Sequence, residues 1–313
     1  MAFEEDLLVA FGAERVRAGV PLAAFTTFRV GGLADWFVEV RGRAEVLRAL
    51  DLARGAGVPL TVLGGGSNVL ISDRGVRGLV IRIHGGEVEQ VRDDLVRAEA
   101  GVTINGLVRW TIPRGLAGLE MWAGTPGTVG GAVFGNAHFQ GRLMGDGIEM
   151  VGLVAREGTL AEVPASEMEF SYDYSRLHRT RELVVWADFR VGRGEPSRLR
   201  EVARRSLRFR KHTQPLQLPS AGCTFQNPDP ARDALPPGVL PSAGALIDLA
   251  GLKGTRIGGA MVSPTHANFI VNAGGARAAD VAALIERCRR AVQERFGVAL
   301  REEVEYVGDF GGD

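Results

Sequence analysis

The sequence predicts a mixed α+β fold that is divided among several domains. Its 313 residues exceed the usual size of one domain, and 45% of them are apolar, which is enough to bury a large core without disulfides or metal ions. Amphipathic segments with helical spacing alternate with short segments rich in β-branched and aromatic residues. Because 37 basic and 37 acidic residues cancel, we do not expect a protein that binds nucleic acid through bulk charge.

The first part of the chain predicts a small βαβ-like domain. We expect a helix over residues 1–20, a strand over 28–40, a helix over 44–59 and a strand over 60–66 that runs into three glycines. The acidic N-terminal residues lack the basic start and apolar core of a signal peptide, and no apolar run is long enough to span a membrane. We therefore expect a cytoplasmic protein.

The middle of the chain predicts a strand-rich domain. A helix near 103–115 should begin with Thr103 as its N-cap and be disturbed by Pro113. Short strands are expected at 78–83, 94–100, 151–157 and 182–191.

The last part predicts a third domain, so the expected boundaries are 1–62, 63–196 and 197–313. A helix over 279–296 should place Cys288 in its core face, and a short strand should close the chain. The arginine-rich run 204–211 is expected to be a solvated face of a helix over 197–212. The inward face of that helix should hold Leu199, Val202, Leu207 and Phe209.

Two glycine-rich segments are candidates for holding an anionic ligand. In VLGGGSNVLIS (62–72), three glycines precede Ser67 and Asn68, and the absence of a Cβ lets backbone N–H groups approach a phosphate. It is neither a Walker loop nor a good Rossmann fingerprint, because no Gly-Lys-Ser/Thr and no helix follows. In AGTPGTVGGAVFGNAHFQG (123–141), six glycines accompany Thr125 and Asn136. Each segment alone is compatible with tight turns, but the two together suit a dinucleotide.

Two further segments carry groups that can move a proton. Cys223 lies among small residues in LPSAGCTFQNP (218–228), where a thiol serves as a proton donor, a nucleophile or an ordinary buried side chain. In the C-terminal segment, strand alternation would put Glu303 and Glu305 on one face and Glu302 on the other. An inward carboxylate would be an acid or base; otherwise this is a solvated face. The two cysteines have no metal-ligand spacing, so we expect no metal site.

Several motifs together resemble one enzyme family, the bacterial UDP-N-acetylenolpyruvoylglucosamine reductases, over nearly the whole chain. In order they are TTFRVGG, VLGGGSNVL, AGTPGTVGGAVFGNA, FSYDYS, PSAGCTFQNP, AGALIDLAG, HANFIVN and LREEVEYVG. The glycine segments also occur in other flavoproteins of the vanillyl-alcohol-oxidase type, whereas the PSAG, HANF and terminal glutamate motifs point to the reductase.

The resemblance implies both a fold and a reaction. The fold is α+β, with an FAD-binding domain of the vanillyl-alcohol-oxidase type in two lobes (1–62 and 63–196) and a C-terminal substrate-binding domain (197–313). The reaction is reduction of UDP-N-acetylglucosamine enolpyruvate to UDP-N-acetylmuramate by NADPH through FAD. Hydride passes from flavin N5 to C3, and a proton is added at C2. This is a cytoplasmic step of peptidoglycan synthesis, on which cell shape and division depend. A UDP-sugar is the implied ligand, with no obligate protein partner.

The resemblance also implies roles for individual residues. Cys223 matches a serine that donates the proton in many members, and Glu303 matches the glutamate that polarises the substrate carboxylate. Tyr172, Gln226 and Asn227 match substrate-binding positions, although Gln226 stands where a lysine is common. The implied FAD contacts are Gly64, Gly65, Gly66, Ser67, Asn68, Thr125, Pro126, Gly127, Gly130 and Gly131.

One motif departs from the family pattern. In FSYDYSR (170–176), Asp173 stands where the family has an arginine directly after the tyrosine. Arg176 is the candidate for the missing cation, but in a regular strand it would lie on the opposite face from position 173. The short link from this motif to the 182–191 strand leaves no room for the substrate-covering insertion of one subgroup. We therefore expect the subgroup that lacks it.

Three other functions are compatible with parts of the sequence. One is an oxygen-using oxidase of the same flavoprotein fold, such as a sugar-alcohol oxidase. Another is a cysteine enzyme with Cys223 as nucleophile and His212 or His266 as base, which leaves both glycine segments unexplained. The third is a catalytically impaired ligand-binding homologue, which Asp173 favours. The sequence does not determine the oligomeric state, the preference for NADPH over NADH, or the residues that contact uracil.

Overall fold

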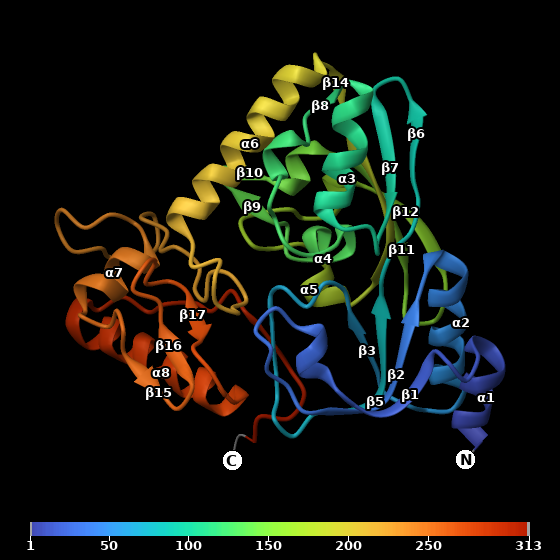
Figure 1. Ribbon diagram of the computed structural model, residues 1–313, viewed down its shortest axis with the longest axis horizontal. Coiled ribbons are helices and arrows are strands. Elements are labelled where there is room, and N and C mark those ends of the chain that lie inside the picture. The colour runs from blue at the N-terminus through green and yellow to red at the C-terminus, as the bar shows by residue number, and fades with distance from the viewer. Residues whose placement is uncertain (1, 312–313) are drawn as a thin grey trace. The chain divides into compact units, whose positions relative to one another are not determined.

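The computed structural model describes residues 2–311 and divides the chain into two compact units (Figure 1). Unit 1 comprises Met1–Val20, Asp35–Gly65 and Gly78–Phe209, and unit 2 comprises Pro21–Ala34, Gly66–Arg77 and Arg210–Asp313. Each unit therefore collects segments that are distant in the sequence. The division into domains 1–62, 63–196 and 197–313 stays a prediction.

The first sheet of unit 1 has the strand order β1-β2-β5-β3, with β3 and β5 parallel. Helices α1 and α2 pack against each other beside it, and Phe3, Leu7 and Ala49 join the same core. The bounds are α1 Ala2–Phe11, β1 Val16–Pro21, β2 Leu33–Val40, α2 Gly42–Gly55, β3 Leu60–Leu63 and β5 Val76–Ile83.

The helix expected over residues 1–20 is wrong in its second half. Helix α1 ends at Phe11, because the next residue, Gly12, has φ +84°, a left-handed conformation that ends helices. Val16–Pro21 then forms strand β1. The alternation in that strand is weak, with one buried residue among six, so helical and strand patterns are hard to tell apart there.

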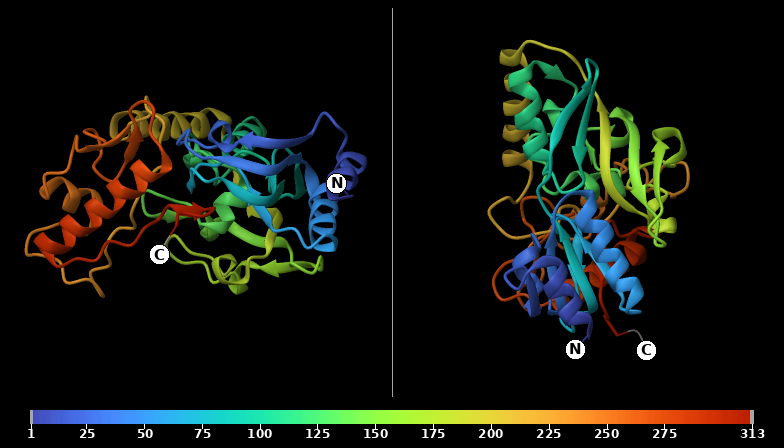
Figure 2. Two further views of the ribbon diagram at one scale, coloured as in Figure 1. Left: turned by 90° about the horizontal axis from the view of Figure 1, so that it is seen from below. Right: turned by 90° about the vertical axis from the view of Figure 1, so that its right-hand side faces the viewer.

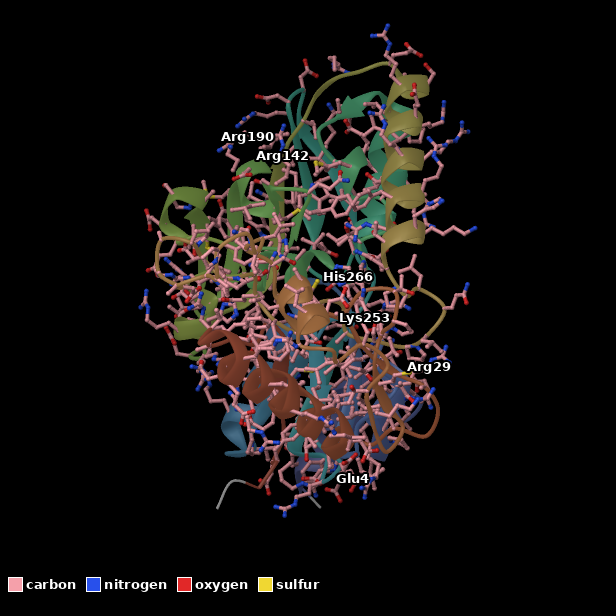
Figure 3. The ribbon with its side chains drawn as sticks, turned by 90° about the vertical axis from the view of Figure 1, so that its left-hand side faces the viewer. Glu4, Arg29, Arg142, Arg190, Lys253 and His266 are labelled. Atoms are coloured by element: carbon pink, nitrogen blue, oxygen red, sulfur yellow. The ribbon has the colours of Figure 1, made fainter. Side chains whose placement is uncertain are left out.

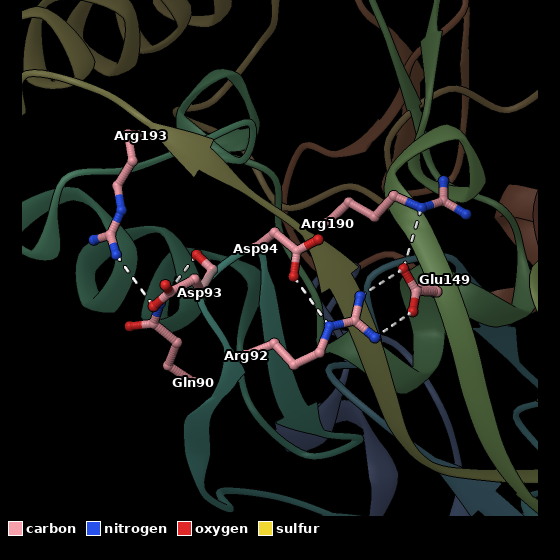
Figure 4. Close-up of polar contacts among 7 residues, drawn as sticks. All are labelled: Gln90, Arg92, Asp93, Asp94, Glu149, Arg190 and Arg193. Carbon is pink, nitrogen blue, oxygen red and sulfur yellow. Dashed lines mark hydrogen bonds and ion pairs between the residues drawn. The ribbon is translucent and has the colours of Figure 1, made fainter.

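The second sheet of unit 1 is antiparallel, with the order β12-β11-β13-β7-β6. Its bounds are β6 Val88–Arg92, β7 Leu95–Glu99, β11 Ile148–Val154, β12 Leu160–Pro164 and β13 Leu183–Arg190. At its surface, Arg92 binds Asp94 and Glu149, and Arg190 also binds Glu149 (Figure 4). Such exposed ion pairs each contribute little to stability.

Short elements connect the two sheets and carry the glycine-rich segment 123–141. Helix α3 begins as expected, because Oγ1 of Thr103 accepts a hydrogen bond from Gly106 N at 3.0 Å, and Pro113 falls in a 3₁₀ turn after the helix. The bounds are α3 Ile104–Thr111, β8 Leu116–Ala117, α4 Val129–Phe134, β9 His138–Phe139, β10 Arg142–Leu143, α5 Leu177–Thr180 and β14 Gly192–Arg193. The 3₁₀ turns of unit 1 are Ile112–Arg114, Glu120–Trp122, Met144–Gly147 and Ala165–Glu167.

The long helix α6 (Pro196–Thr213) is the yellow helix in Figure 2. Its residues up to Phe209 belong to unit 1, and those from Arg210 onward belong to unit 2. The buried stripe of α6 contains Leu199, Ala203, Ser206 and Arg210, spaced by three or four residues. The inward placement expected for Leu207 and Phe209 is wrong: they are 48% and 43% exposed. They lie beside the stripe, and a buried arginine occupies its last position.

Unit 2 is built around helix α8, which packs on a three-stranded sheet β15-β16-β17 and on α7. The carboxylate of Asp73 accepts hydrogen bonds from Ala278 N (2.8 Å) and Ala279 N (2.9 Å) at the start of α8. Strand β4 pairs in parallel with β18. The bounds are β4 Val69–Ile71, α7 Ala243–Leu249, β15 Arg256–Ile257, β16 Ala260–Val262, β17 Ile270–Asn272, α8 Ala278–Phe296 and β18 Glu305–Val307, with a 3₁₀ turn at Leu22–Phe25.

Across residues 2–311, no helix is both long enough and apolar enough to cross a membrane.

Candidate active site

The two glycine-rich segments meet in unit 1. A Cβ on Gly64 would lie 2.6 Å from Oγ1 of Thr128, and a Cβ on Gly65 would lie 2.7 Å from Cα of Gly127. Cα of Gly127 is a backbone atom that cannot rotate away, so position 65 accepts only glycine, whereas a residue with a Cβ at position 64 would require the Thr128 side chain to move. The result is a surface of backbone without side chains. It is formed by two segments about 60 residues apart in the sequence, as Gly65 and Gly127 are.

The second segment is held in place by Asn105 at the start of α3. Its Oδ1 accepts from Gly124 N at 2.7 Å, and its Nδ2 donates to Thr125 O at 3.1 Å. Oγ1 of Thr128 is buried and has no hydrogen-bond partner among residues 2–311. A buried hydroxyl of this kind beside a surface free of Cβ atoms fits a polar cofactor that approaches the backbone closely.

The first segment continues into unit 2 at Gly66, whose φ is +61°. Asn68 connects this segment to the C-terminal one: its Nδ2 donates to Glu303 O at 3.0 Å, and its backbone O accepts from Glu305 N at 3.0 Å. Oδ1 of Asn68 is buried and has no hydrogen-bond partner in the described part of the chain. The glycine loop and the terminal glutamates are thus parts of one hydrogen-bonded structure.

The segments that contain Cys223 and Glu303 run side by side in unit 2. Glu303 N donates to Thr224 O at 2.8 Å, and Gln226 N donates to Arg301 O at 2.9 Å. Phe225 and Glu302 form an antiparallel bridge between these two bonds. Backbone hydrogen bonds therefore align the two segments that contain the expected proton-carrying residues.

The expectation that one terminal strand contains all three glutamates is wrong. Strand β18 contains only Glu305–Val307 and pairs with β4, whereas Glu302 pairs with Phe225. The backbone changes partner between Glu303, which binds Thr224, and Glu305, which binds Asn68. Simple alternation of side chains therefore does not hold across this change.

Asn268 holds the segment that contains Cys223 in place through hydrogen bonds. The sequence pattern indicated no role for this residue. Its Oδ1 accepts from Phe225 N at 3.0 Å, its Nδ2 donates to Phe225 O at 2.7 Å, and its backbone O accepts from Thr224 N at 2.7 Å. The side chain is 3% exposed. One feature of the sequence could have indicated this role: Asn268 is an amide inside the apolar run ANFIVN, and a buried amide requires hydrogen-bond partners.

We expect Asn268→Ala to destabilise the fold by about 2–5 kcal/mol, because both polar backbone groups of buried Phe225 lose their partner. Denaturant unfolding measures this change. Gln217→Ala, at an exposed position in unit 2, should change the free energy of unfolding by less than about 0.5 kcal/mol. A loss below about 1 kcal/mol in Asn268→Ala would contradict the assigned fastening role.

Arg210 is a second residue that sequence reasoning missed. The arginine-rich run was expected to be solvated, and Arg204, Arg205 and Arg208 are exposed, but Arg210 is 6% exposed. Burial lowers the pKa of its guanidinium to about 10, and the charge of Cys223 opposes that shift. Arg210 is therefore a buried basic residue in the same unit as Cys223.

Cys288 was expected in the core, and His266 was considered as a catalytic base. Burial raises the pKa of the Cys288 thiol to about 12, which agrees with the expected core position. Burial, assisted by the Lys253 charge, lowers the pKa of His266 (Figure 3). Nδ1 of His266 accepts a hydrogen bond from Asn268 N at 3.3 Å, so this ring is engaged by the backbone.

The motif at 170–176 lies in unit 1. Arg176 makes a two-point ion pair with Glu182, at 3.2 Å from Nε and 3.0 Å from Nη2, and its role as the missing cation stays a prediction. Asp173 lies 3.1 Å from Nε2 of His138, and the rings of His138 and Tyr172 are 4.7 Å apart. The sequence pointed to Asp173 only as a departure and gave His138 no role.

Two protein-family models match this chain. One, described as an FAD binding domain, matches residues 34–164. The other, described as the C-terminal domain of UDP-N-acetylenolpyruvoylglucosamine reductase, matches residues 214–307. These matches confirm the expected fold class, an α+β FAD-binding domain followed by a second domain.

Relatives in sequence and structure give the same result. The chain is 40% identical to a UDP-N-acetylenolpyruvoylglucosamine reductase of Heliobacterium modesticaldum, over 93% of this chain and 90% of the relative. It is 38% identical to a reductase of the same name from Bacillus cereus, over 96% and 97%. The crystal structure of UDP-N-acetylenolpyruvylglucosamine reductase from Thermus caldophilus superposes with a TM-score of 0.77 at 36% identity, covering 94% of this chain and 99% of that one.

Proposed function

The chain belongs to the UDP-N-acetylenolpyruvoylglucosamine reductase family, and from this premise we propose how its residues carry out the reaction of that family. The protein is a flavin-dependent oxidoreductase of peptidoglycan synthesis, a UDP-N-acetylmuramate dehydrogenase that uses FAD and NADPH. The observation that carries this assignment is 40% identity over 93% of the chain. The UDP-sugar is UDP-N-acetylglucosamine enolpyruvate, and we place the reaction in the cytoplasm.

The bare backbone of the two glycine segments is proposed to hold FAD. The close approach of Gly65 to Gly127 and the buried hydroxyl of Thr128 support this, because both favour a polar group lying directly on the main chain. When bound there, FAD would supply the hydride chemistry that couples oxidation of NADPH to reduction of the enolpyruvyl group. The residues proposed to contact FAD are Gly64, Gly65, Gly66, Ser67, Asn68, Thr125, Pro126, Gly127, Gly130 and Gly131.

Cys223 is proposed to deliver the proton to C2. As the S–H bond breaks, negative charge develops on the sulfur, and the buried Arg210 guanidinium stabilises it. Solvent then returns a proton to the thiolate. The backbone bond of Glu303 to Thr224, next to Cys223, supports a shared site for these two side chains. Glu303 polarises the substrate carboxylate, and Tyr172, Gln226 and Asn227 contact the substrate.

Product analysis with the FAD-loaded protein tests this function. We expect one UDP-N-acetylmuramate for each NADPH oxidised under anaerobic conditions, identified by a mass two hydrogens above that of the substrate. Oxidation of NADPH that requires oxygen and leaves the sugar nucleotide unchanged would favour the oxidase instead. Binding of both ligands without turnover would favour the catalytically impaired homologue.

A further inference from the structure

The second glycine-rich segment lies along the chain that leads into helix α3. Three backbone hydrogen bonds and an antiparallel bridge between Thr103 and Thr128 join the two stretches within unit 1. The bonds run from Gly130 N to Ala100 O (2.9 Å), from Val129 N to Val102 O (2.8 Å) and from Ile104 N to Gly127 O (3.1 Å). Backbone hydrogen bonds therefore hold residues 127–130 in place.

The side chain of Asn105 continues this pairing beyond the end of the backbone contacts. Helix α3 begins at Ile104, so the backbone of Asn105 lies in the first helical turn and not in an extended strand. The side-chain amide, however, offers the same kinds of donor and acceptor as a peptide group. Its Oδ1 accepts from Gly124 N at 2.7 Å, and its Nδ2 donates to Thr125 O at 3.1 Å. One side chain thus takes the place of a strand residue.

Residues 124–127 depend on this support, because their own sequence restricts them little. Gly124 and Gly127 have φ +86° and +100°, a region that glycine enters without steric cost but in which nothing local holds it. Pro126 has no N–H to donate. The two bonds of Asn105 bracket the backbone torsions of Gly124 and Thr125, and they therefore restrict both residues together.

We propose that Asn105 is a positioning residue for the cofactor, which fixes the 124–127 backbone in the conformation that receives FAD. This inference rests on the function proposed above, in which the two glycine-rich segments hold FAD. A surface that is fixed before its ligand arrives does not have to be ordered on binding, so the ligand binds more tightly. The affinity for FAD is thus set in part by a side chain outside both glycine-rich segments.

The dissociation constant of FAD tests the proposal. We expect Asn105→Ala to raise it by about tenfold or more, because two hydrogen bonds that order the segment are lost. Dilution of the FAD-loaded protein, followed by ultrafiltration and measurement of the flavin in each fraction, gives this constant. The temperature should lie well below the midpoint of thermal unfolding. Nearly all molecules are then folded, so a loss of global stability alone does not change the measured constant.

Asn105→Asp is a second variant that keeps the size and shape of the side chain. Its carboxylate can still accept from Gly124 N, but it cannot donate to Thr125 O. It also adds a negative charge beside a segment proposed to hold an anionic cofactor. We therefore expect it to weaken FAD binding at least as much as Asn105→Ala does.

Thr103→Ala is the matched control, because it alters the same helix start and leaves both bonds of Asn105 in place. It removes the side-chain cap of α3, in which Oγ1 accepts from Gly106 N at 3.0 Å. It should lower the midpoint of thermal unfolding but change the dissociation constant of FAD by less than about twofold.

The outcomes separate the proposal from its premise. Equal weakening of FAD binding by Thr103→Ala and Asn105→Ala would show that Asn105 only supports the start of α3, and it would overturn the proposal. Normal FAD affinity in both Asn105 variants would also overturn it. If the unaltered protein binds no FAD, the proposed function itself fails.

Discussion

Cys223→Ala is expected to slow reduction of the sugar nucleotide by about 10²- to 10⁴-fold, the usual contribution of a positioned general acid. Reduction of the bound flavin by NADPH should keep its normal rate, because that step needs no proton from the thiol. Cys223→Ser should retain activity, since a hydroxyl at this position matches the family pattern. Anaerobic stopped-flow measurement of the two half-reactions separates these effects.

The second cysteine provides the control for this experiment. Cys288→Ala removes a buried thiol of α8 that takes no part in the proposed chemistry, so both half-reactions should keep their rates. If Cys223→Ala and the unaltered protein reoxidise at equal rates with the substrate, the proton comes from another group. The rates of both half-reactions in Arg210→Met would then show whether the buried guanidinium has any function beyond packing.

Gly65→Ala is expected to weaken FAD binding by more than about tenfold. The added methyl group would lie 2.7 Å from Cα of Gly127. Because the position of a Cβ is fixed by its own backbone and Cα of Gly127 is itself backbone, the two glycine segments must move apart. The purified variant should therefore contain little flavin, which the ratio of absorbance at the visible flavin band to that of the protein measures. Added FAD should restore the band only at high concentration.

Gly55→Ala is the matched control, because the added methyl group meets nothing within 4 Å at the end of α2. It should retain FAD and should not lower the thermal stability of the protein. A Gly65→Ala protein that is purified with a full complement of FAD would contradict the proposal that these two segments form the cofactor surface.

Local patterns in the sequence predicted much of the fold, because local rules act within one element. Thr103 was recognised as an N-cap from its position before an apolar run, and Cys288 as a core residue from helical spacing. The first helix was extended too far because the pattern gave no weight to Gly12 as a stop. Leu207 was placed inward because the stripe of α6 was read from apolar residues alone.

What the sequence could not predict depends on contacts between distant segments. Arg210 is buried although arginine rarely is, because the stripe of its helix continues into unit 2. Asn268 holds Phe225, 43 residues away, and His138 meets Asp173 only because a turn is fastened onto the glycine segment. The spacing of apolar residues along the sequence carries no information about such pairs of distant residues. The family resemblance named Cys223 and Glu303, and the structure supplies the backbone bonds that align their segments.

The measurement that tests the central claim most directly is an anaerobic titration of the flavin band. NADPH should bleach the visible absorbance of the FAD-loaded protein, and UDP-N-acetylglucosamine enolpyruvate should restore it rapidly in the absence of oxygen, one equivalent for each flavin. Such recovery identifies the cofactor, the electron donor and the acceptor in one experiment. A band that bleaches but recovers only with oxygen, or a protein that shows no flavin band even after FAD is added, would contradict the account.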